Sequence, residues 1–183
     1  MKKAIGYLVL VVLLVGAAFL IYRVFVPETP EFIYRLRFFA RTEEVNLYFV
    51  RGEAVIPVTR RVARVREPEQ KVRTVIGLLL EGPDESEKNN GFDTALPAGA
   101  RFLSAFLQGN IVFLNFSAQI EEGGGTETMK TRLRQIVYTA TQFDDVEKVS
   151  FLIEGQPIKY FSSEGLTEVE HPLGRAGLEM EER

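Results

Sequence analysis

The sequence predicts an α+β domain that follows a single N-terminal transmembrane helix. Three observations lead to this class: a long run without charge near the N-terminus, two segments with helical spacing of apolar residues, and five segments with strand composition. The expected order of the domain is ββαββαβ, with both helices packed on one small sheet as a two-layer sandwich. The 183 residues of the chain suit one domain of ordinary size with a short extra module.

The charge-free run extends from Ala4 to Tyr22 and is flanked by lysines before it and Arg23 after it. At 1.5 Å per residue, such a helix spans about 28 Å, close to the ~30 Å hydrocarbon core of a bilayer. We therefore predict a cytoplasmic leader at 1–3, an uncleaved anchor at 4–26 and an extracytoplasmic C-terminal domain in the cell membrane. Arginines beyond the run leave the opposite orientation open, and a cleaved leader is the alternative to an anchor.

Residues 27–44 are predicted to form a stalk or linker. Pro27 and Pro30 favour extended chain, because proline fixes φ and cannot continue a helix. Residues 32–39 mix aromatic and arginine side chains, which suits either the membrane interface or the start of the folded domain.

The domain is expected to begin with a hairpin and a helix. Strand composition marks 45–50 and 54–58, which a short turn containing glycine connects. The following helix starts at Pro68 and stops at Gly82-Pro83. Its apolar stripe has helical spacing and consists of Val72, Val75, Ile76 and Leu79. The polar residues 84–94 are predicted to form a surface loop.

A second hairpin and a second helix follow. Alternating residues at 102–107 and 111–116 surround a turn with Gly109, which predicts two paired strands. The helix comes after three glycines, with Thr126 or Thr128 as its cap. Its predicted core-facing residues are Met129, Leu133, Ile136, Val137 and Ala140.

The last predicted element is a strand at 149–153, which a turn at 154–157 ends. The expected domain therefore covers 45–161. A polar C-terminal tail at 162–183 is rich in charge and poor in large apolar residues, so we expect it to be loosely held.

The composition excludes most catalytic and metal chemistry. The absence of cysteine removes disulfides, thiolate metal sites and cysteine nucleophiles, and the single His171 removes any site that needs two imidazoles. The adjacent carboxylate pairs lie in predicted loops, where nothing separates their pKa values: Glu43-Glu44, Glu121-Glu122 and Asp144-Asp145. A net charge of −3 argues against a nucleic-acid binder. The sequence predicts no catalytic residue, no metal site and no cofactor.

The glycine run Gly123-Gly124-Gly125 before a helix is a weak candidate for phosphate binding, because helix N-termini attract anions. No Gly-Lys-Ser/Thr follows it, and Glu121, Glu122 and Glu127 would repel a phosphate. We interpret the run as a flexible turn.

One stretch of the sequence is basic, and it extends from Arg60 to Arg73. One interpretation is a solvated strand edge, because cationic side chains at an edge discourage pairing with another strand. The alternative is a contact with an anionic partner, namely lipid headgroups, wall polymer or the acidic face of another subunit. The candidate contact residues are Arg60, Arg61, Arg64 and Arg66.

Several segments, in order, resemble the GerMN domain family. They are Leu47-Tyr48-Phe49, residues 55–60, 78–83, 96–99 and 112–117, and the stretch from Gln135 to Gly155. The resemblance covers about residues 45–175. It departs from the family pattern in having one copy of the domain, an anchor in place of a lipidated cysteine, and Ala140 where leucine is commoner.

The resemblance implies a sporulation, germination or envelope protein without enzymatic activity, and a fold similar to the ring-building motifs that line up side by side in secretion-type assemblies. We therefore expect a membrane-anchored scaffold that contacts other envelope proteins and its own copies, and no nucleic acid. The alternative function is a module that binds wall polymer or another anionic ligand through Arg60–Arg73.

Overall fold

The computed structural model describes residues 14–19, 22, 42–161 and 167–180, and the chain divides into two units at residues 1–42 and 43–183. Residues 14–19 are helical. The rest of the predicted anchor at 4–26, and nearly all of the stalk at 27–44 with its aromatic segment at 32–39, lie outside the described residues. Within the described ranges, no helix is long and apolar enough to cross a membrane.

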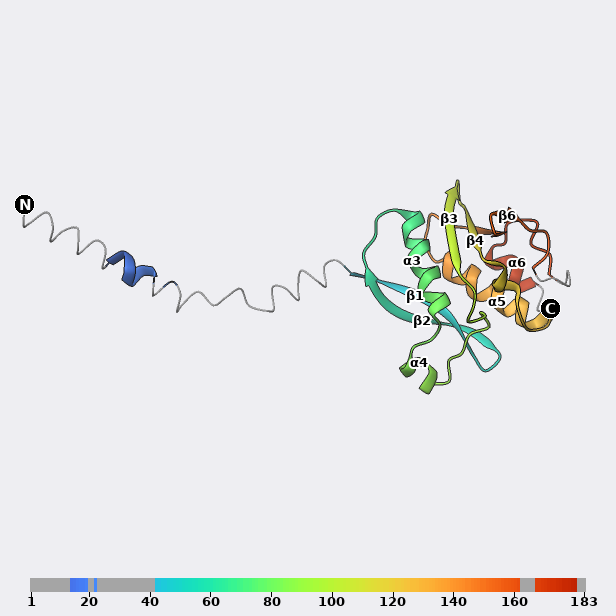
Figure 1. The fold of residues 1–183 in the computed structure, drawn as a ribbon, viewed down its shortest axis with the longest axis horizontal. Coiled ribbons are helices and arrows are strands. Elements are labelled where there is room, and N and C mark those ends of the chain that lie inside the picture. The colour runs from blue at the N-terminus through green and yellow to red at the C-terminus, as the bar shows by residue number, and fades with distance from the viewer. Residues whose placement is uncertain (1–13, 20–21, 23–41, 162–166, 181–183) are drawn as a thin grey trace, which may run out of the picture. The chain divides into compact units, whose positions relative to one another are not determined.

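The second unit is an α+β domain, as predicted (Figure 1). Its strands are β1 (Thr42–Arg51), β2 (Ala54–Ala63), β3 (Phe102–Gln108), β4 (Ile111–Phe116), β5 (Lys148–Ile153) and β6 (Gln156–Pro157). Its helices are α3 (Pro68–Glu81), α4 (Glu85–Asn89), the 3₁₀ turn η1 (Ala118–Glu121), α5 (Thr126–Ala140) and α6 (Arg175–Met180).

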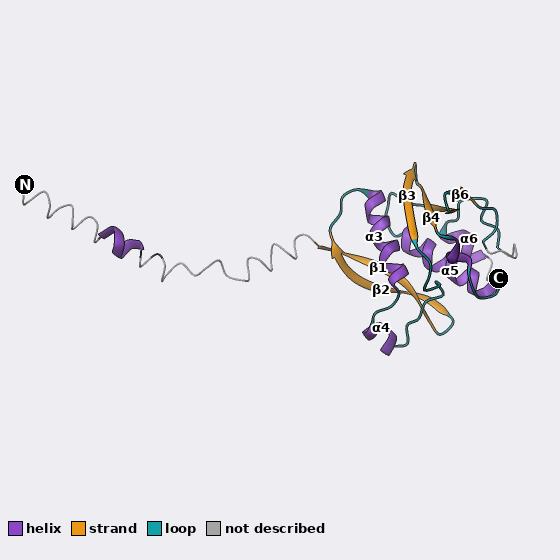
Figure 2. Cartoon of the chain, in the orientation of Figure 1, coloured by secondary structure: helices purple, strands orange, loops and turns teal. Residues whose placement is uncertain are grey.

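The strands form two sheets, where the sequence predicted one (Figure 2). The hairpin β1–β2 stands by itself, and the other sheet has the order β3-β4-β5-β6. The hairpin stays separate because the outer edge of β1 bonds to side chains of α5 and of Gln142, just after that helix, instead of a further strand.

The first helix forms as predicted, and the residues after it correct the predicted surface loop. Helix α3 buries its expected apolar stripe of Val72, Val75, Ile76 and Leu79. Within the expected loop at 84–94, residues 85–89 form α4, which a capping box starts. The Asp84 carboxylate accepts a hydrogen bond from the Glu87 N–H, and the Glu87 carboxylate accepts one from the Asp84 N–H. This reciprocal pair satisfies two backbone donors that a short helix would otherwise leave unbonded.

The four-stranded sheet has one covered face. Strands β3 and β4 form the predicted antiparallel hairpin, and β5 runs parallel to β4 because α5 crosses over between them. Ala105, Leu114 and Phe151 lie side by side across the three strands and are buried. Helix α3 packs against β3 and α5, and α5 also packs against β5.

Helix α5 buries the predicted stripe but has a different start. All of Met129, Leu133, Ile136, Val137 and Ala140 are buried. The cap position belongs to Gly125, whose carbonyl accepts the Met129 N–H, and neither Thr126 nor Thr128 caps the helix. A glycine is tolerated at this position, so the threonines fall inside the first turn.

The C-terminal residues 167–178 pack on the domain, which corrects the expected loose tail. Val169 donates its N–H to the Lys159 carbonyl, and Leu173 exchanges two backbone hydrogen bonds of 2.8 Å with Val149. Leu178 is only 4% exposed. The polar composition misled the prediction because backbone hydrogen bonds and a few buried side chains, among them Val169 and Leu178, are enough to hold the segment.

Candidate functional site

Arg60, the first of the predicted contact residues, is bound inside the domain. Its guanidinium forms a bidentate ion pair with Glu87, donates a 3.0 Å hydrogen bond to the Gly82 carbonyl and lies 5.3 Å from the centre of the Phe49 ring. The hydrogen bond from Arg60 holds the pKa of the Glu87 carboxyl below its usual value, and the same bond raises the pKa of Arg60. Arg60 therefore ties β2 to the end of α3 and to α4.

The other three predicted residues face solvent. Arg61 bonds to Glu44 across the hairpin at 3.2 Å, with both side chains more than 60% exposed. Arg64 and Arg66 are exposed and have no ion pair with any described residue. The structure thus separates Arg60 from the other three arginines, and their partner contact stays a prediction.

The remaining cations of the basic stretch are also used within the fold. Arg73 donates to Glu69 and to the Ala105 carbonyl of β3, and the Lys71 ammonium lies 5.6 Å from the centre of the Phe143 ring. Arg73 and Lys71 are therefore engaged within the fold and are less available to an anionic ligand than the sequence suggested.

The most buried cation of the domain is Arg132, which the sequence analysis did not single out. It is 2% exposed and lies on α5. Its guanidinium donates to four backbone carbonyls, those of Ala95, Ile120, Glu122 and Gly123. Burial lowers its pKa. The signal was present in the spacing, since Arg132 follows Met129 by three residues and precedes Ile136 by four, which places it on the apolar stripe.

The glycine run has a structural role in this arrangement. Gly124 has φ +87°, and a Cβ there would lie 2.5 Å from Thr128 Cβ, so the position cannot hold a side chain without rearrangement. The carbonyl of the preceding Gly123 accepts from Arg132. The loop therefore fits closely over the first turn of α5, which supports its interpretation as a turn.

The polar side of α5 completes the edge of β1. Thr139 Oγ1 accepts the Tyr48 N–H at 3.1 Å, and Gln135 Nε2 donates to the Tyr48 carbonyl at 2.8 Å. Gln142, just beyond the helix, makes the same two kinds of bond with the backbone of Asn46. Three side chains at helical spacing thus take the place of a neighbouring strand.

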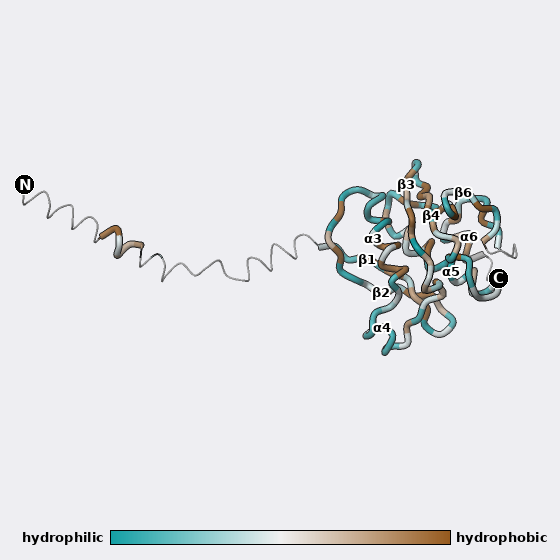
Figure 3. Tube along the Cα trace, viewed as in Figure 1, coloured by the Kyte–Doolittle hydropathy of each residue, from teal (hydrophilic) through white to brown (hydrophobic). Residues whose placement is uncertain are grey.

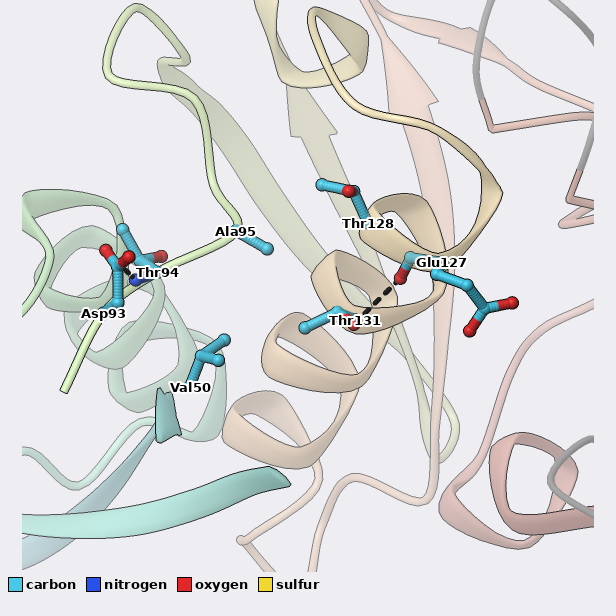
Figure 4. Close-up of a pocket in the computed structure, with 7 residues that line it drawn as sticks. All are labelled: Val50, Asp93, Thr94, Ala95, Glu127, Thr128 and Thr131. Carbon is cyan, nitrogen blue, oxygen red and sulfur yellow. Dashed lines mark hydrogen bonds between the residues drawn. The ribbon is translucent and has the colours of Figure 1, made fainter. Parts of the chain in front are cut away.

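A shallow hollow of about 260 Å³ lies between the end of β1 and the first turns of α5 (Figure 4). Asp93 and Glu127 are its only carboxylates, and the Glu127 carboxylate points away from Asp93 in the close-up. Asp93 accepts a hydrogen bond from the Thr94 N–H, and Thr131 donates to the Glu127 carbonyl. The hollow is smaller than the usual ~300–1,000 Å³ of ligand sites and brings no acid and base together.

No described part of the chain gathers metal ligands. Groups of three or more His, Asp or Glu side chains in reach of one ion are absent from the described residues. His171 is exposed.

The open sheet face is the side of the four-stranded sheet opposite its buried side. Its positions on β3, β4 and β5 are Ser104, Phe106, Gln108, Ile111, Phe113, Asn115, Lys148, Ser150 and Leu152, and none of them is buried. Phe106 is 44% exposed and stacks on Phe113, with ring centroids 4.6 Å apart. Figure 3 shows hydrophobic residues along β3 and β4. Exposed apolar area of this kind is typical of contact sites.

These features define a small α+β domain whose described surface offers an open apolar sheet face and no substrate-sized cavity. The chain belongs to the Germane family, described as sporulation and spore germination, whose profile matches residues 46–159. This family, which contains the GerMN domain, is not known as catalytic.

Solved structures agree with this assignment at the level of the fold. The first GerMN domain of the sporulation protein GerM from Bacillus subtilis is similar with a TM-score of 0.58 and 21% identity, over 73% of this chain and 98% of that one. A protein from Clostridium perfringens, assigned provisionally as a lipoprotein, gives 0.55 and 19%, over 75% and 90%.

The tandem GerMN domains of the same Bacillus protein give a TM-score of 0.56 and 19% identity over 74% of this chain. The match covers 47% of that tandem chain, so this chain spans about half of the pair. Among curated proteins, none matches this sequence significantly.

Proposed function

We propose that this protein is a non-catalytic, membrane-anchored scaffold whose extracytoplasmic GerMN domain acts in envelope assembly, sporulation or germination through protein contacts. The observation that carries the proposal is the open sheet face, on which Phe106 and Phe113 remain accessible in a domain of this family. Burying these rings against a partner would remove apolar area from water, the main source of association free energy.

The anchor and the location rest on other support. The uncharged run from Ala4 to Tyr22 has the length of a membrane span, and the similar Clostridium protein is assigned as a lipoprotein, a kind of protein held at a membrane. A reporter that is active only outside the cytoplasm, fused to the C-terminus, should be active. A stable but inactive fusion would overturn the extracytoplasmic placement.

The contact role can be tested at the open sheet face in cells. A photocrosslinking amino acid at position 106 of the full-length protein should form adducts with a discrete envelope protein or with a second copy of the chain. The same amino acid at Lys88, exposed on α4, is the matched control and should give none.

The substitution Phe106→Ser should abolish association while leaving the folded domain intact, because the ring is already 44% exposed. Thermal unfolding and sedimentation of the purified variant would measure both. A chain that stays monomeric, without adducts at position 106 under any growth condition in which it is expressed, would contradict the contact role.

The binding of wall polymer through Arg60–Arg73 is less well supported. Arg60, Arg73 and Lys71 are engaged with Glu87, Glu69 and Phe143 respectively, so they are not available as a continuous cationic surface.

A further inference from the structure

The two edges of the β1–β2 hairpin differ. From Asn46 to Val50 the outer edge of β1 is saturated with hydrogen bonds. Asn46 bonds to Gln142, Tyr48 bonds to side chains of α5, and Val50 exchanges two 2.8 Å backbone bonds with Asp93. A strand whose backbone groups are all satisfied cannot accept another strand beside it.

The outer edge of β2 has the opposite character. Thr59 donates from its hydroxyl to Asn46, and Arg61 pairs with Glu44, which places these residues opposite one another across the hairpin. Opposed residues of an antiparallel pair either bond to each other or both point away. Since the Asn46 backbone points toward Gln142, the Thr59 backbone must point away from β1.

The same alternation turns Val55, Pro57, Arg61 and Ala63 outward with Thr59, and Pro57 has no N–H to offer. In the part of the chain that the structure describes, Val55, Thr59 and Ala63 make no backbone hydrogen bond on that side. Thr59 and Ala63 are exposed. We call the outward groups from Val55 to Ala63 the β2 edge.

Charge indicates what kind of strand fits the β2 edge. Residues 54–66 contain four arginines and no acidic residue, although the chain as a whole carries a net charge of −3. Arg60 is held by Glu87 and Arg61 by Glu44, whereas Arg64 and Arg66 extend the exposed positive charge past the end of the strand. A peptide that pairs along β2 with acidic side chains would meet these cations.

The same residues disfavour a second copy of the chain at this edge. Antiparallel pairing of two β2 strands about Thr59 would place Pro57, which has no N–H, opposite Arg61 of the other copy. It would also bring two sets of arginines together without intervening acids. A partner strand would lose the one ladder bond at Pro57, whereas two copies would lose two such bonds, one from each Pro57, and would also oppose like charges.

We propose that the β2 edge binds an extended acidic segment of a partner protein, which adds a third strand to the hairpin. The backbone ladder supplies the affinity and the arginines select acidic partners. This site is separate from the open sheet face, so it goes beyond the contact role proposed above and can succeed or fail independently of it.

A synthetic peptide tests the proposal on the full-length protein in detergent. The probe is a fluorescent octapeptide that alternates Glu and Thr, and its binding is measured by anisotropy. One control replaces every Glu with Lys, and another keeps the charges but is N-methylated throughout, which removes its backbone donors. We expect each control to bind at least about tenfold more weakly, the effect of losing one or two net hydrogen bonds or the charge attraction.

Matched variants locate the site. Thr59→Pro removes the outward N–H and should weaken binding about tenfold, whereas Thr59→Val loses only the hydroxyl and should stay within about twofold. Arg64→Gln with Arg66→Gln should weaken binding and reduce its salt dependence. Amide exchange at Thr59 and Ala63 should slow when the peptide binds, and Phe106→Ser should leave all of these results unchanged. Unfolding curves confirm that each variant is folded.

Several results would overturn the proposal. Equal binding of the N-methylated peptide would mean that charge alone is recognised. Binding to anionic vesicles that survives Thr59→Pro but requires Arg64 and Arg66 would assign the surface to lipid headgroups. Self-association abolished by Thr59→Pro would assign the edge to a second copy. Absence of binding at millimolar peptide would exclude the site.

Discussion

Arg132 shows how one buried charge can organise a loop. Its planar guanidinium has five donors in a fixed geometry, and four carbonyls converge on it, one from Ala95 and three from the stretch 120–123. Among the described residues no carboxylate is hydrogen-bonded to it, so the carbonyl dipoles compensate the charge together with the electrostatic attraction of Glu121. The cation in turn satisfies carbonyl oxygens that would otherwise be unbonded in the interior. Arg132 therefore has a structural role. Its replacement should lower the free energy of unfolding, and the loss should grow with the number of buried carbonyl oxygens that are left without a donor.

We therefore predict that Arg132→Met lowers the free energy of unfolding by about 2 to 4 kcal/mol, because several buried carbonyls lose their donor. Urea denaturation measures the change. Lys130→Met on the same helix removes only a 3.5 Å contact with the exposed Glu127 and should cost less than about 1 kcal/mol. Equal losses for the two variants would refute the role assigned to Arg132.

The pair of Arg60 and Glu87 predicts a dependence of stability on acidity. The pKa of Glu87 is lower in the folded state than its usual 4.5, because Arg60 hydrogen-bonds to the carboxylate. A depressed pKa contributes stability that is complete above 4.5 and disappears as the pH falls through the folded-state value. The stability of the protein should therefore decline below about pH 4.5.

Unfolding free energies of the wild type and Glu87→Gln, measured from pH 7 to pH 3, test this dependence. The variant should be less stable at pH 7 and should show a shallower decline toward pH 3, because it lacks the titrating group. Parallel acid limbs for the two proteins would show that other carboxyl groups dominate.

At the scale of elements, α5 contacts the core with one face and the edge of β1 with another. Its apolar stripe packs into the core, while Gln135 and Thr139 bond to the β1 backbone as a strand would. Thr139→Val keeps the side-chain volume but leaves the Tyr48 N–H without an acceptor, so it should cost about 1 to 3 kcal/mol of stability.

Chemical denaturation of Thr139→Val should be compared with that of Thr131→Val. Thr131 donates only to the Glu127 carbonyl of its own helix, so its substitution should change stability by less than about 0.5 kcal/mol. Hydrogen exchange at Tyr48 should accelerate in the first variant alone. Unchanged protection of that amide would contradict the role of Thr139.

The elements that could be predicted from the sequence are those whose signal is local. The spacing of Val72 to Leu79 and of Met129 to Ala140 predicted both long helices. Strand composition around a glycine turn predicted the first hairpin, and alternation predicted the second. The capping box of Asp84 and Glu87 is also local, at the expected three-residue spacing, and would have predicted α4.

What could not be predicted depends on partners far along the chain. Gln135 and Thr139 are ordinary polar residues on a helix until β1 lies beside them, 87 and 91 residues away. Their bonds decide that the strands form two sheets. The candidate contact arginines were chosen by charge alone, and only the folded chain shows that Glu87 binds Arg60 while Arg64 and Arg66 remain exposed.

At the scale of the whole domain, the C-terminal segment packs against β1, the first strand of the domain, and against the end of α5. The Arg175 guanidinium lies 5.3 Å from the ring centres of both Tyr48 and Tyr138, and it donates to Thr141 Oγ1 and to the Tyr138 carbonyl. A cation between two aromatic rings with hydrogen bonds at its edge is a favourable arrangement.

We predict that Arg175→Ala destabilises the domain by about 1 to 2 kcal/mol, through the loss of both ring contacts and the hydrogen bonds. Thermal unfolding of the purified protein measures the loss. Arg101→Ala, which removes an exposed side chain, is the control and should have little effect. A melting temperature that is the same for Arg175→Ala and the wild type would show that the segment contributes nothing to stability.

The position of Arg175 also orders events in time. Tyr48 leaves the ribosome early, and the residue that packs on it follows 127 positions later. At about 5 to 20 residues per second, this interval is roughly 6 to 25 s, during which β1 exists without its last neighbour. The native domain can therefore be completed only after Arg175 has been synthesised, and a nascent chain stalled before that residue would lack this contact.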